Sequence, residues 1–542
     1  MVLAGASFSR VAKTDGSQEV SLSPLPHFEN NIMRSDGMNY CHVRLKSDVR
    51  CLPEALVEND ADILAGPDVI SRLPALPIPS HVTPSVSIPF YDDVQATLFG
   101  KELLYEEMEY SWEILKPFLE TGLITLKSGL LPYKKGFCCQ RCHTKTKKSF
   151  ACFDCFRCGE TCVYCRHCIM MGRISTCSVL LRWNGPAPNY HYNDNFQKWE
   201  GTFSKGQQKA ATKIIDTIQE QANILVWAVC GAGKTEILFP GLEQALRIGQ
   251  RVLITTPRTD VVLELLPRLR KVLPTTSIAG LYGDSEEKHI PAQLIIATTH
   301  QTMRFTSTFD TVIIDEVDAF PYTADHSLTQ AVTKAKKQQA ATIHLTATPT
   351  TTLKKRVNAN RLPCVRIPQR YHGFPLPVPR FQWIGSWQRR IENRSLPASC
   401  NKWCQERIEQ NIPAFLFVPS VAVLEKVTDL LKEQWPAVEG VHSGDQERLQ
   451  KVNQFRKGSI PLLVTTTILE RGVTIAGVDV AVFGAESAIF TESALVQIAG
   501  RAGRSKEQPE ADVVYFHFGK TNAMAAAKRH ITTMNRESNQ KG

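Results

Sequence analysis

Short apolar runs, separated by stretches of helix length, dominate the second half of the chain. They are rich in β-branched residues, which is typical of strands buried on both faces of a parallel sheet. A Pro- and Gly-rich connection at 361–379 divides them into two series. The predicted strands are 251–257, 294–299, 311–318 and 341–349 in the first series, and 413–420, 438–444, 460–469, 478–487 and 511–519 in the second. We therefore predict two tandem α/β domains, at 191–370 and 371–542.

The first part of the chain lacks this regularity. Residues 1–92 show no sustained period, and 74–89 is rich in Pro and Ser, so we predict a poorly ordered N-terminal segment. From 91 to 131 apolar residues such as Leu103 and Trp112 recur at spacings near 3.6. This pattern predicts a helical lead-in to a cysteine-rich unit at 93–190.

Ten of the 16 cysteines fall between residues 138 and 177, mostly at CxxC spacing. Such clustering indicates metal binding rather than disulfides. Two CxxC pairs suit a four-cysteine zinc ribbon, because each pair presents two thiolates to one side. These pairs are Cys139 with Cys142, and Cys155 with Cys158. Four thiolates leave no open position on Zn²⁺ for a water, so we predict a structural role.

Three more cysteines follow at three-residue steps: Cys162, Cys165 and Cys168. They permit a second Zn²⁺, or a different choice of four ligands for a single one. The candidates for a fourth ligand are Cys152, His167 and Cys177.

The stretch AVCGAGKT at 228–235 lies between an apolar run and a predicted helix. It fits the P-loop pattern, with Ala228 where the first Gly is usual. Lys234 is predicted to reach the β- and γ-phosphates of ATP, and the Thr235 hydroxyl to hold Mg²⁺. The predicted ATP-binding residues of this loop are Ala228, Val229, Cys230, Gly231, Ala232, Gly233, Lys234 and Thr235.

Gln207 lies near the start of a predicted helix ahead of the P-loop. Its side-chain amide is able to make paired hydrogen bonds to an adenine edge, so we predict an ATP contact. A surface role is an equally good interpretation for a single Gln.

An acidic cluster, Asp315-Glu316-Val317-Asp318, ends one of the predicted strands. An acid that emerges from a buried strand beside a P-loop is placed to hold Mg²⁺, and its neighbour to orient and deprotonate the attacking water. We assign these roles to Asp315 and Glu316. The pattern assigns no role to Asp318.

The second predicted domain has no P-loop, but it contains QIAGRAGR at 497–504. Arg501 and Arg504 are three residues apart, which would place them on one face of a helix. We predict that this domain closes over the ATP bound by its neighbour and that the two arginines stabilise charge on the γ-phosphate.

The net charge of +10 and the pI near 8.8 suit a polyanionic partner. No run approaches the roughly 18 apolar residues of a spanning helix, and no secretory signal is visible. These features predict a cytoplasmic protein.

The ordered motifs resemble those of the superfamily 2 helicases, in which two RecA-like domains clasp ATP. The motifs are SKGQ, AVCGAGKT, TTPRTD, ATTHQ, DEVD, TAT, FLFVPS, TTTILERGVTI and QIAGRAGR, within 199–520. The resemblance implies that five residues contact the nucleic-acid backbone: Arg258, Thr298, Thr299, Thr465 and Thr466.

The segments CVYCRHCIMMGR, WEGTFSKGQ and DEVDAFP are similar to the ComFA family of late competence ATPases. This resemblance implies an ATP-dependent translocase that drives single-stranded DNA import during natural transformation. It further implies other competence proteins as partners, namely a membrane DNA channel and a ComFC-like protein. A position at the inner face of the membrane and a homo-oligomer are also expected.

Two alternative functions remain. A PriA-like replication-restart helicase has a similar motor, although its cysteines lie inside the second motor domain rather than ahead of the first. A non-catalytic nucleic-acid-binding scaffold would use the zinc unit alone, which the intact Lys234, Glu316, Arg501 and Arg504 disfavour.

Overall fold

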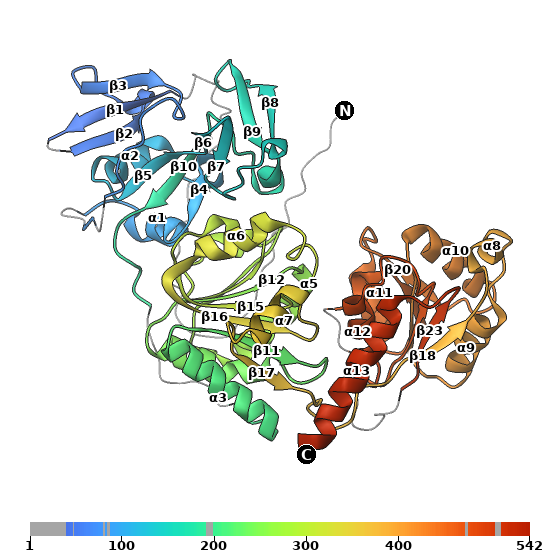
Figure 1. Ribbon diagram of the computed structural model, residues 1–542. Coiled ribbons are helices and arrows are strands. Elements are labelled where there is room, and N and C mark those ends of the chain that lie inside the picture. The colour runs from blue at the N-terminus through green and yellow to red at the C-terminus, as the bar shows by residue number, and fades with distance from the viewer. Residues whose placement is uncertain are drawn as a thin grey trace, which may run out of the picture.

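The computed structural model describes residues 39–46, 48–79, 82–83, 87–190, 199–471, 475–503 and 511–541. Two α/β domains lie side by side, and an N-terminal unit sits on the first of them (Figure 1). The predicted fold, two parallel-sheet domains preceded by a cysteine-rich unit, is confirmed. Arg504 lies outside the described residues.

The first α/β domain contains a seven-stranded parallel sheet in the order β13-β14-β12-β15-β16-β11-β17. Its strands are β11 (Asn223–Ala228), β12 (Val252–Thr256), β13 (Ile278–Leu281), β14 (Leu294–Thr298), β15 (Phe309–Ile314), β16 (Lys336–Thr346) and β17 (Cys364–Ile367). Its helices are α3 (Lys205–Gln219), α4 (Phe239–Arg247), α5 (Thr259–Val272), α6 (His326–Ala335) and α7 (Thr351–Asn358). Because β12 and β14 are buried along their whole length, their apolar runs were readable from the sequence.

The second α/β domain contains a six-stranded parallel sheet in the order β18-β23-β22-β19-β21-β20. Its strands are β18 (Arg380–Trp383), β19 (Ala414–Phe417), β20 (Glu439–Val441), β21 (Leu462–Thr465), β22 (Asp479–Phe483) and β23 (Val513–His517). Its helices are α8 (Trp387–Glu392), α9 (Ala398–Glu409), α10 (Val421–Lys432), α11 (Arg448–Arg456), α12 (Glu492–Ala499) and α13 (Asn522–Lys541). Helix α13 reaches back to the first domain, where Glu537 pairs with Arg366 at 2.9 Å.

The N-terminal unit is more ordered than the sequence predicts. A three-stranded antiparallel sheet is formed by β1 (Tyr40–Leu45), β2 (Asp48–Pro53) and β3 (Asp62–Asp68). The prediction of a poorly ordered segment is therefore wrong for this part of 1–92. The sheet is stable because Tyr40, Cys41 and Val43 are buried in a core shared with the elements that follow.

The predicted helical lead-in is also only partly right. Two short helices form, α1 (Tyr91–Leu98) and α2 (Trp112–Glu120), but Leu103 lies in a strand between them. That strand, β4 (Glu102–Leu104), pairs with β10 (Val179–Trp183), which also pairs with β5 (Ile124–Ser128). Tertiary pairing overrides the helical period here. Two hairpins complete the unit: β6 (Leu130–Tyr133) with β7 (Gly136–Cys139), and β8 (Phe150–Asp154) with β9 (Thr161–Cys165).

The N-terminal unit and the first α/β domain share one hydrophobic core. Leu104 and Leu130 pack in the same cluster as Phe305 and Leu328. Buried ion pairs cross the same boundary, since Lys334 on α6 lies 2.9 Å from the Glu102 carboxylate on β4. The two units are therefore joined as firmly as parts of a single domain.

Candidate active site and metal centres

The P-loop follows β11, as predicted, but the helix behind it begins late. Gly231 and Gly233 have φ of 77° and 73°, which non-Gly residues rarely adopt. A 3-10 turn, Glu236–Leu238, follows the loop, and α4 starts only at Phe239. Pro240 explains the delay, because it has no N–H to donate to the carbonyl four residues earlier.

Both α/β domains line one cavity of ≈ 290 Å³ beside the P-loop. The first domain contributes Lys234, Thr235, Asp315 and Glu316, and the second contributes Arg471, Gln497 and Arg501. The predicted P-loop residues, the predicted acids Asp315 and Glu316, and Arg501 are thus brought together across the domain boundary. An anionic ligand in this cavity would meet cations from both sides.

The two acids of the cavity differ in environment. Burial raises the pKa of the Asp315 carboxyl to about 6, and the charge of Lys234 counteracts part of this shift. A buried carboxylate next to a hydroxyl such as Thr235 is a fitting donor set for Mg²⁺. Glu316 adopts a φ of 56°, in the left-handed region, and its Oε2 lies 3.5 Å from Nη1 of Arg471. Such a strained backbone is frequent at catalytic positions.

Asp318, to which the sequence assigned no role, links the two domains. Its Oδ2 accepts from Arg471 Nη2 at 2.6 Å, Thr348 Oγ1 at 2.6 Å and Ser493 Oγ at 2.7 Å. Its Oδ1 accepts from Thr346 at 2.5 Å. Burial opposes the charge on Asp318, but Arg471 holds the pKa of this carboxyl well below its usual range.

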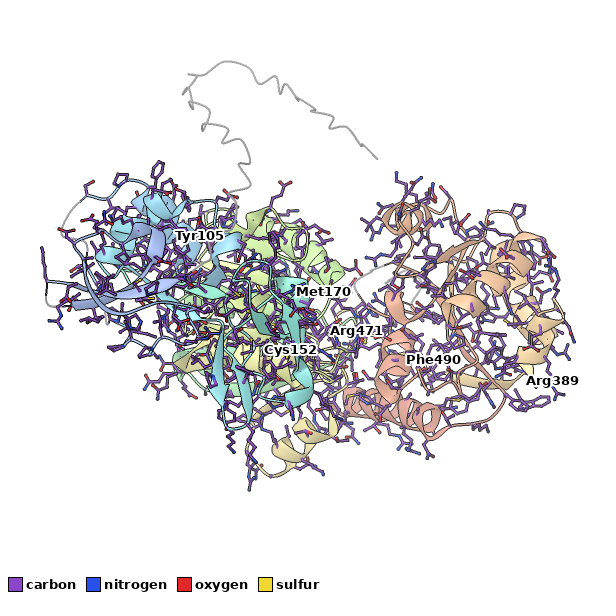
Figure 2. All side chains as sticks on the ribbon, turned by 90° about the horizontal axis from the view of Figure 1, so that it is seen from above. Tyr105, Cys152, Met170, Arg389, Arg471 and Phe490 are labelled. Atoms are coloured by element: carbon purple, nitrogen blue, oxygen red, sulfur yellow. The ribbon has the colours of Figure 1, made fainter. Side chains whose placement is uncertain are left out.

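Arg471 is a cavity residue to which the sequence assigned no role. Figure 2 shows it on the side of the second α/β domain that faces the first. Its side chain is only 2% exposed, and Glu316 and Asp318 raise its pKa against the effect of burial. The available signal was the Glu-Arg pair behind β21, inside the motif TTTILERGVTI.

Arg501 does not lie on a helix as expected. Helix α12 ends at Ala499, so Arg501 belongs to the turn that follows, and the assumed helical spacing is wrong. Gly500 caps the end of α12 where it meets the P-loop, and a larger residue at this position would press on Cys230. Arg501 still lines the cavity, and its Nε donates to the Glu470 carbonyl at 3.0 Å.

Gln207 and Cys230 both contact groups around the P-loop. The Gln207 amide donates to the Ala232 carbonyl at 2.9 Å and accepts from the Ser204 N–H at 2.9 Å, so it braces the loop. Its predicted contact with adenine stays a prediction. Cys230 Sγ donates to Gln497 Oε1 on α12 at 3.0 Å, which joins the tip of the P-loop to the second domain.

The predicted nucleic-acid contacts lie at strand ends, but most of their side chains are covered. Thr299 and Thr465 are fully buried, and Thr298 is almost so. Arg258 pairs with Glu470 of the second domain at 2.8 Å. Their role on a DNA backbone therefore stays a prediction, as does that of the half-buried Thr466.

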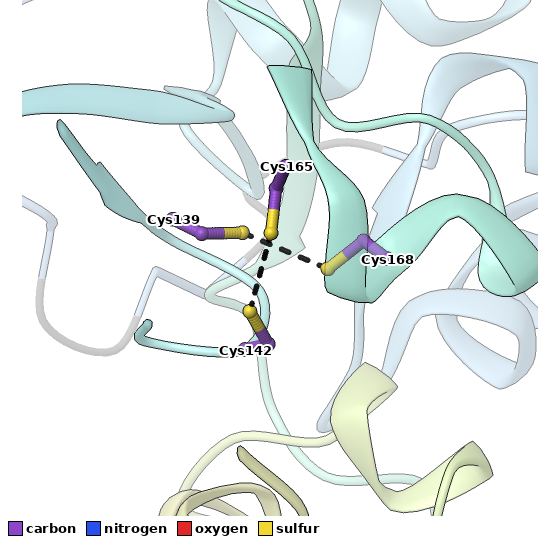
Figure 3. Close-up of side chains that lie close together, drawn as sticks. All are labelled: Cys139, Cys142, Cys165 and Cys168. Atoms are coloured by element: carbon purple, nitrogen blue, oxygen red, sulfur yellow. Dashed lines mark hydrogen bonds between the residues drawn. The ribbon is translucent and has the colours of Figure 1, made fainter. Parts of the chain in front are cut away.

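The cysteines form two four-residue clusters in an interleaved order. In each, the four sulfurs lie within 4.8 Å of one another. The first cluster is Cys139, Cys142, Cys165 and Cys168 (Figure 3), and the second is Cys155, Cys158, Cys162 and Cys177. The predicted pairing of Cys139/Cys142 with Cys155/Cys158 is therefore wrong. Hairpin β8–β9 folds Cys165 back towards Cys139, which spacing alone does not reveal.

The chemistry of both clusters fits a tetrahedral metal such as Zn²⁺. The four cysteines of the first cluster are buried, and hydrogen bonding to the Cys139 sulfur raises the pKa of Cys142 and Cys168 far above that of a free thiol. A bound cation would reverse this effect by holding all four as thiolates. Cys152 is exposed and His167 contacts Ser149 at 2.9 Å, so neither belongs to a cluster.

Three family descriptions match successive parts of the chain. Residues 87–182 match the competence protein ComFA N-terminal domain, 200–351 the type III restriction enzyme res subunit, and 399–506 the helicase conserved C-terminal domain. The matched segments follow the three structural units in order. The helicase-type domains imply the use of ATP and Mg²⁺.

Two bacterial relatives align with this chain over most of their own length. Competence protein ComFA of Bacillus subtilis (strain 168) is 46% identical over 446 residues, which is 82% of this chain and 96% of the relative. Competence protein ComFA of Streptococcus pneumoniae (strain ATCC BAA-255 / R6) is 36% identical, over 69% and 86%. At these identities and coverages, this chain and both relatives are members of one family.

Among solved structures, S. cerevisiae Dbp5 bound to RNA and ADP BeF3 is 15% identical, with a TM-score of 0.45 over 61% of this chain and 91% of that one. This likeness is too weak to support an inference. Within the described residues, none of the helices combines the length and the hydropathy needed to span a membrane. The two bacterial relatives and the paired helicase domains lead to one conclusion: the chain belongs to the ComFA family of competence proteins and is a nucleic-acid-dependent ATPase of the helicase type.

Proposed function

We propose that the chain is an ATP-driven translocase that pulls single-stranded DNA into the cell during natural transformation. The observation that carries this proposal is the composite cavity, in which Lys234 and Glu316 of one domain face Arg471 and Arg501 of the other. A site divided between two domains couples ATP turnover to their relative movement. Family membership supports the competence role.

Each residue of the cavity has a distinct task in this proposal. Lys234 neutralises the β- and γ-phosphates, while Thr235 and Asp315 hold Mg²⁺. Glu316 orients the attacking water and accepts its proton. Arg501, together with Arg504, stabilises the charge that develops on the γ-phosphate. Arg471 belongs to the second domain and contacts both Glu316 and Asp318 of the first, so it keeps the two domains aligned around the cavity.

The strand would run over both domains, with Arg258 and the threonines at the strand ends near its phosphates. Arg258 supports this placement, because it already holds an anionic group, the Glu470 carboxylate, at the domain boundary. Stepping along DNA would then follow each opening and closing of the cleft. Two Zn²⁺ ions would give the N-terminal unit its shape.

ATP hydrolysis tests the proposal directly. It would be measured without nucleic acid and with single-stranded DNA, duplex DNA or RNA, for the wild type and for Lys234→Ala. We expect single-stranded DNA to stimulate the wild type most and the variant to be inactive. Lys271→Ala, at an exposed position on α5, is the matched control. Equal rates of ATP hydrolysis under all four conditions would contradict the proposal.

Translocation itself needs a second measurement, since many ATPases bind DNA without moving. Displacement of streptavidin from biotin placed at either end of an oligonucleotide reports directional movement along one strand. Glu316→Gln should bind the strand but not clear it, because only hydrolysis is blocked. The wild type should clear one end faster than the other.

We further propose that the chain works at the inner face of the membrane. Its partners there would be a membrane DNA channel and a ComFC-like protein, and it would act as a homo-oligomer. The family relationship supports these partners. Co-purification from competent cells, followed by mass measurement of the isolated assembly, tests them.

A further inference from the structure

One stretch of the N-terminal unit is basic and carries no acidic residue at all. Residues 121–153 contain six lysines and one arginine, but no Asp or Glu. Two of these cations have structural partners: Lys127 pairs with Glu102 at 2.8 Å, and the buried Arg141 pairs with Glu107. The other five are placed differently.

Those five lysines are exposed and gather on two neighbouring loops. We define the basic loop surface by Tyr133, Lys134, Lys135, Lys145, Lys147 and Lys148. Within the described ranges, none of its lysines forms an ion pair of the kind made by Lys127. Their charges are therefore not neutralised by the fold itself. Five unpaired positive charges in so small an area attract a polyanion.

An aromatic ring lies among these charges. Tyr133 is 38% exposed, and Lys145 Nζ lies 4.4 Å from the centre of its ring, with Lys134 Nζ at 5.6 Å. Proteins that bind single strands combine cations for the backbone with aromatic rings on which bases stack. The ring and its two flanking cations supply both elements in one place.

The first cysteine cluster holds the two loops in position. Tyr133 and Lys134 lie at the turn of hairpin β6–β7, which ends in Cys139, and the other loop starts just behind Cys142. The Cys139 N–H donates to the Thr144 carbonyl at 3.1 Å, and this joins the loops. The backbones of the two loops are therefore joined without a ligand, which reduces the entropy lost on binding.

We propose that the basic loop surface is a second binding site for single-stranded nucleic acid, separate from the ATP cleft. The inference rests on the proposed function in taking DNA as the strand that is moved. Lysines would contact phosphates, and Tyr133 would stack on one base. An anionic membrane is the competing ligand for such charges. Nucleic acid is favoured because Tyr133 is the one large apolar side chain exposed along the described 130–149 stretch, which leaves little to insert among lipid chains.

Equilibrium binding of an oligo(dT) at several salt concentrations tests the site. Lys147→Ala/Lys148→Ala should bind about tenfold more weakly at low salt, and the slope of log affinity against log salt should fall by about 0.7 for each phosphate that is no longer neutralised. The control is Lys402→Ala/Lys426→Ala, on α9 and α10 of the second α/β domain, which changes the net charge equally. It should bind like the wild type.

Tyr133→Ala should weaken binding about tenfold, whereas Tyr133→Phe should bind normally, because stacking needs only the ring. Metal content and ATP turnover without DNA should not change in any of these variants. Wild-type affinity for oligo(dT) in both Lys147→Ala/Lys148→Ala and Tyr133→Ala would refute the second binding site but leave the proposed function standing. The second binding site would also be refuted if these variants bound oligo(dT) normally and lost only the binding of vesicles of phosphatidylglycerol and phosphatidylcholine. If the wild type itself did not bind oligo(dT), the proposed function would fail as well.

Discussion

Arg471 and Asp318 form a buried ion pair across the two α/β domains, with Nη2 2.6 Å from Oδ2. Arg471→Ala should lower the turnover number for ATP about 100-fold, because it removes a cation from the cavity and leaves Asp318 without its charged partner. The KM for ATP should change little, since the P-loop is untouched. Steady-state kinetics measure both constants.

The control for this substitution is Arg389→Ala, at an exposed position on α8. It also removes an arginine side chain, but far from the cavity, and should leave the turnover number for ATP unchanged. Equal kinetics for Arg471→Ala and Arg389→Ala would show that the interdomain pair has no part in hydrolysis.

The contact between Gly500 and the P-loop allows a steric test of domain closure. A Cβ at Gly500 would lie 2.7 Å from Cys230 Sγ, so Gly500→Ala should keep the domains apart. DNA-stimulated ATP hydrolysis should fall at least about tenfold. Binding of a fluorescent ATP analogue by the P-loop should persist.

A second substitution makes the test specific. Cys230→Gly removes the side chain that the added methyl group of Gly500→Ala would strike, so the double variant should recover activity. Gly519→Ala, where a Cβ meets nothing within 4 Å, should behave as the wild type. If the double variant stayed as inactive as Gly500→Ala, the steric explanation would be refuted.

Metal analysis of double variants tests the interleaved clusters. Cys139→Ser/Cys165→Ser changes one cluster twice and should leave one Zn²⁺ per chain. Cys139→Ser/Cys155→Ser changes both clusters and should leave none. A ribbon built from Cys139, Cys142, Cys155 and Cys158 would give a different result, because the two residues changed in this second variant would then share one ion.

The two clusters should also differ in their effect on the motor. The first shares its core with the first α/β domain, whereas the second packs against Val69 of the N-terminal sheet. Cys165→Ser should therefore lower the unfolding temperature of the ATPase and reduce its activity, while Cys162→Ser should preserve most of it. Thermal unfolding followed by activity measures the difference.

Acid should weaken the joint between the N-terminal unit and the first α/β domain. Burial alone would raise the pKa of Glu102, but Lys334 and Lys127 lower it to about 2. A lowered carboxyl pKa stabilises the fold above the unfolded value of 4.5, and this contribution is lost as the pH falls from 4.5 to 2. The shift corresponds to about 3 kcal/mol. Burial lowers the pKa of Lys334, so the pair contributes less than this at neutral pH, but Lys334 stays charged throughout the acid range.

Denaturant unfolding between pH 7 and pH 3 measures this effect. Glu102→Gln should be less stable than the wild type at neutral pH, and the gap should narrow below pH 4.5. Glu433→Gln removes an exposed ion pair with Arg394 and should cost under about 1 kcal/mol at any pH. A gap for Glu102→Gln that did not change with pH would contradict the assignment.

The sequence predicted the strands that are buried on both faces, because such strands need uninterrupted apolar residues. It missed the edge strands β13, β17 and β18, although it predicted the edge strand β20 at 438–444. The edge strand β17 is only four residues long and alternates half-buried with buried positions, so it gives little signal. β3 was missed because it contains Gly66 and Pro67, which normally indicate a turn.

The candidate site was predictable where one segment holds the chemistry, as in the P-loop and the acidic strand end. It was not predictable where distant segments must meet. Every CxxC pair has the same local geometry, so only the fold decides that Cys142 meets Cys165 rather than Cys155. For Arg471 the motif TTTILERGVTI was the local signal, but its partner Asp318 lies 153 residues earlier in the chain, so the pair itself was not predictable.

Glu470 contacts three arginines, one of which is Arg471 at 3.4 Å. Its carboxylate pairs with Arg258, the proposed phosphate contact, and its carbonyl accepts from Arg501 in the ATP cavity. A phosphate that takes Arg258 must first displace this carboxylate. If Arg258 contacts the strand as proposed, Glu470 would connect that contact to Arg501 in the ATP cavity.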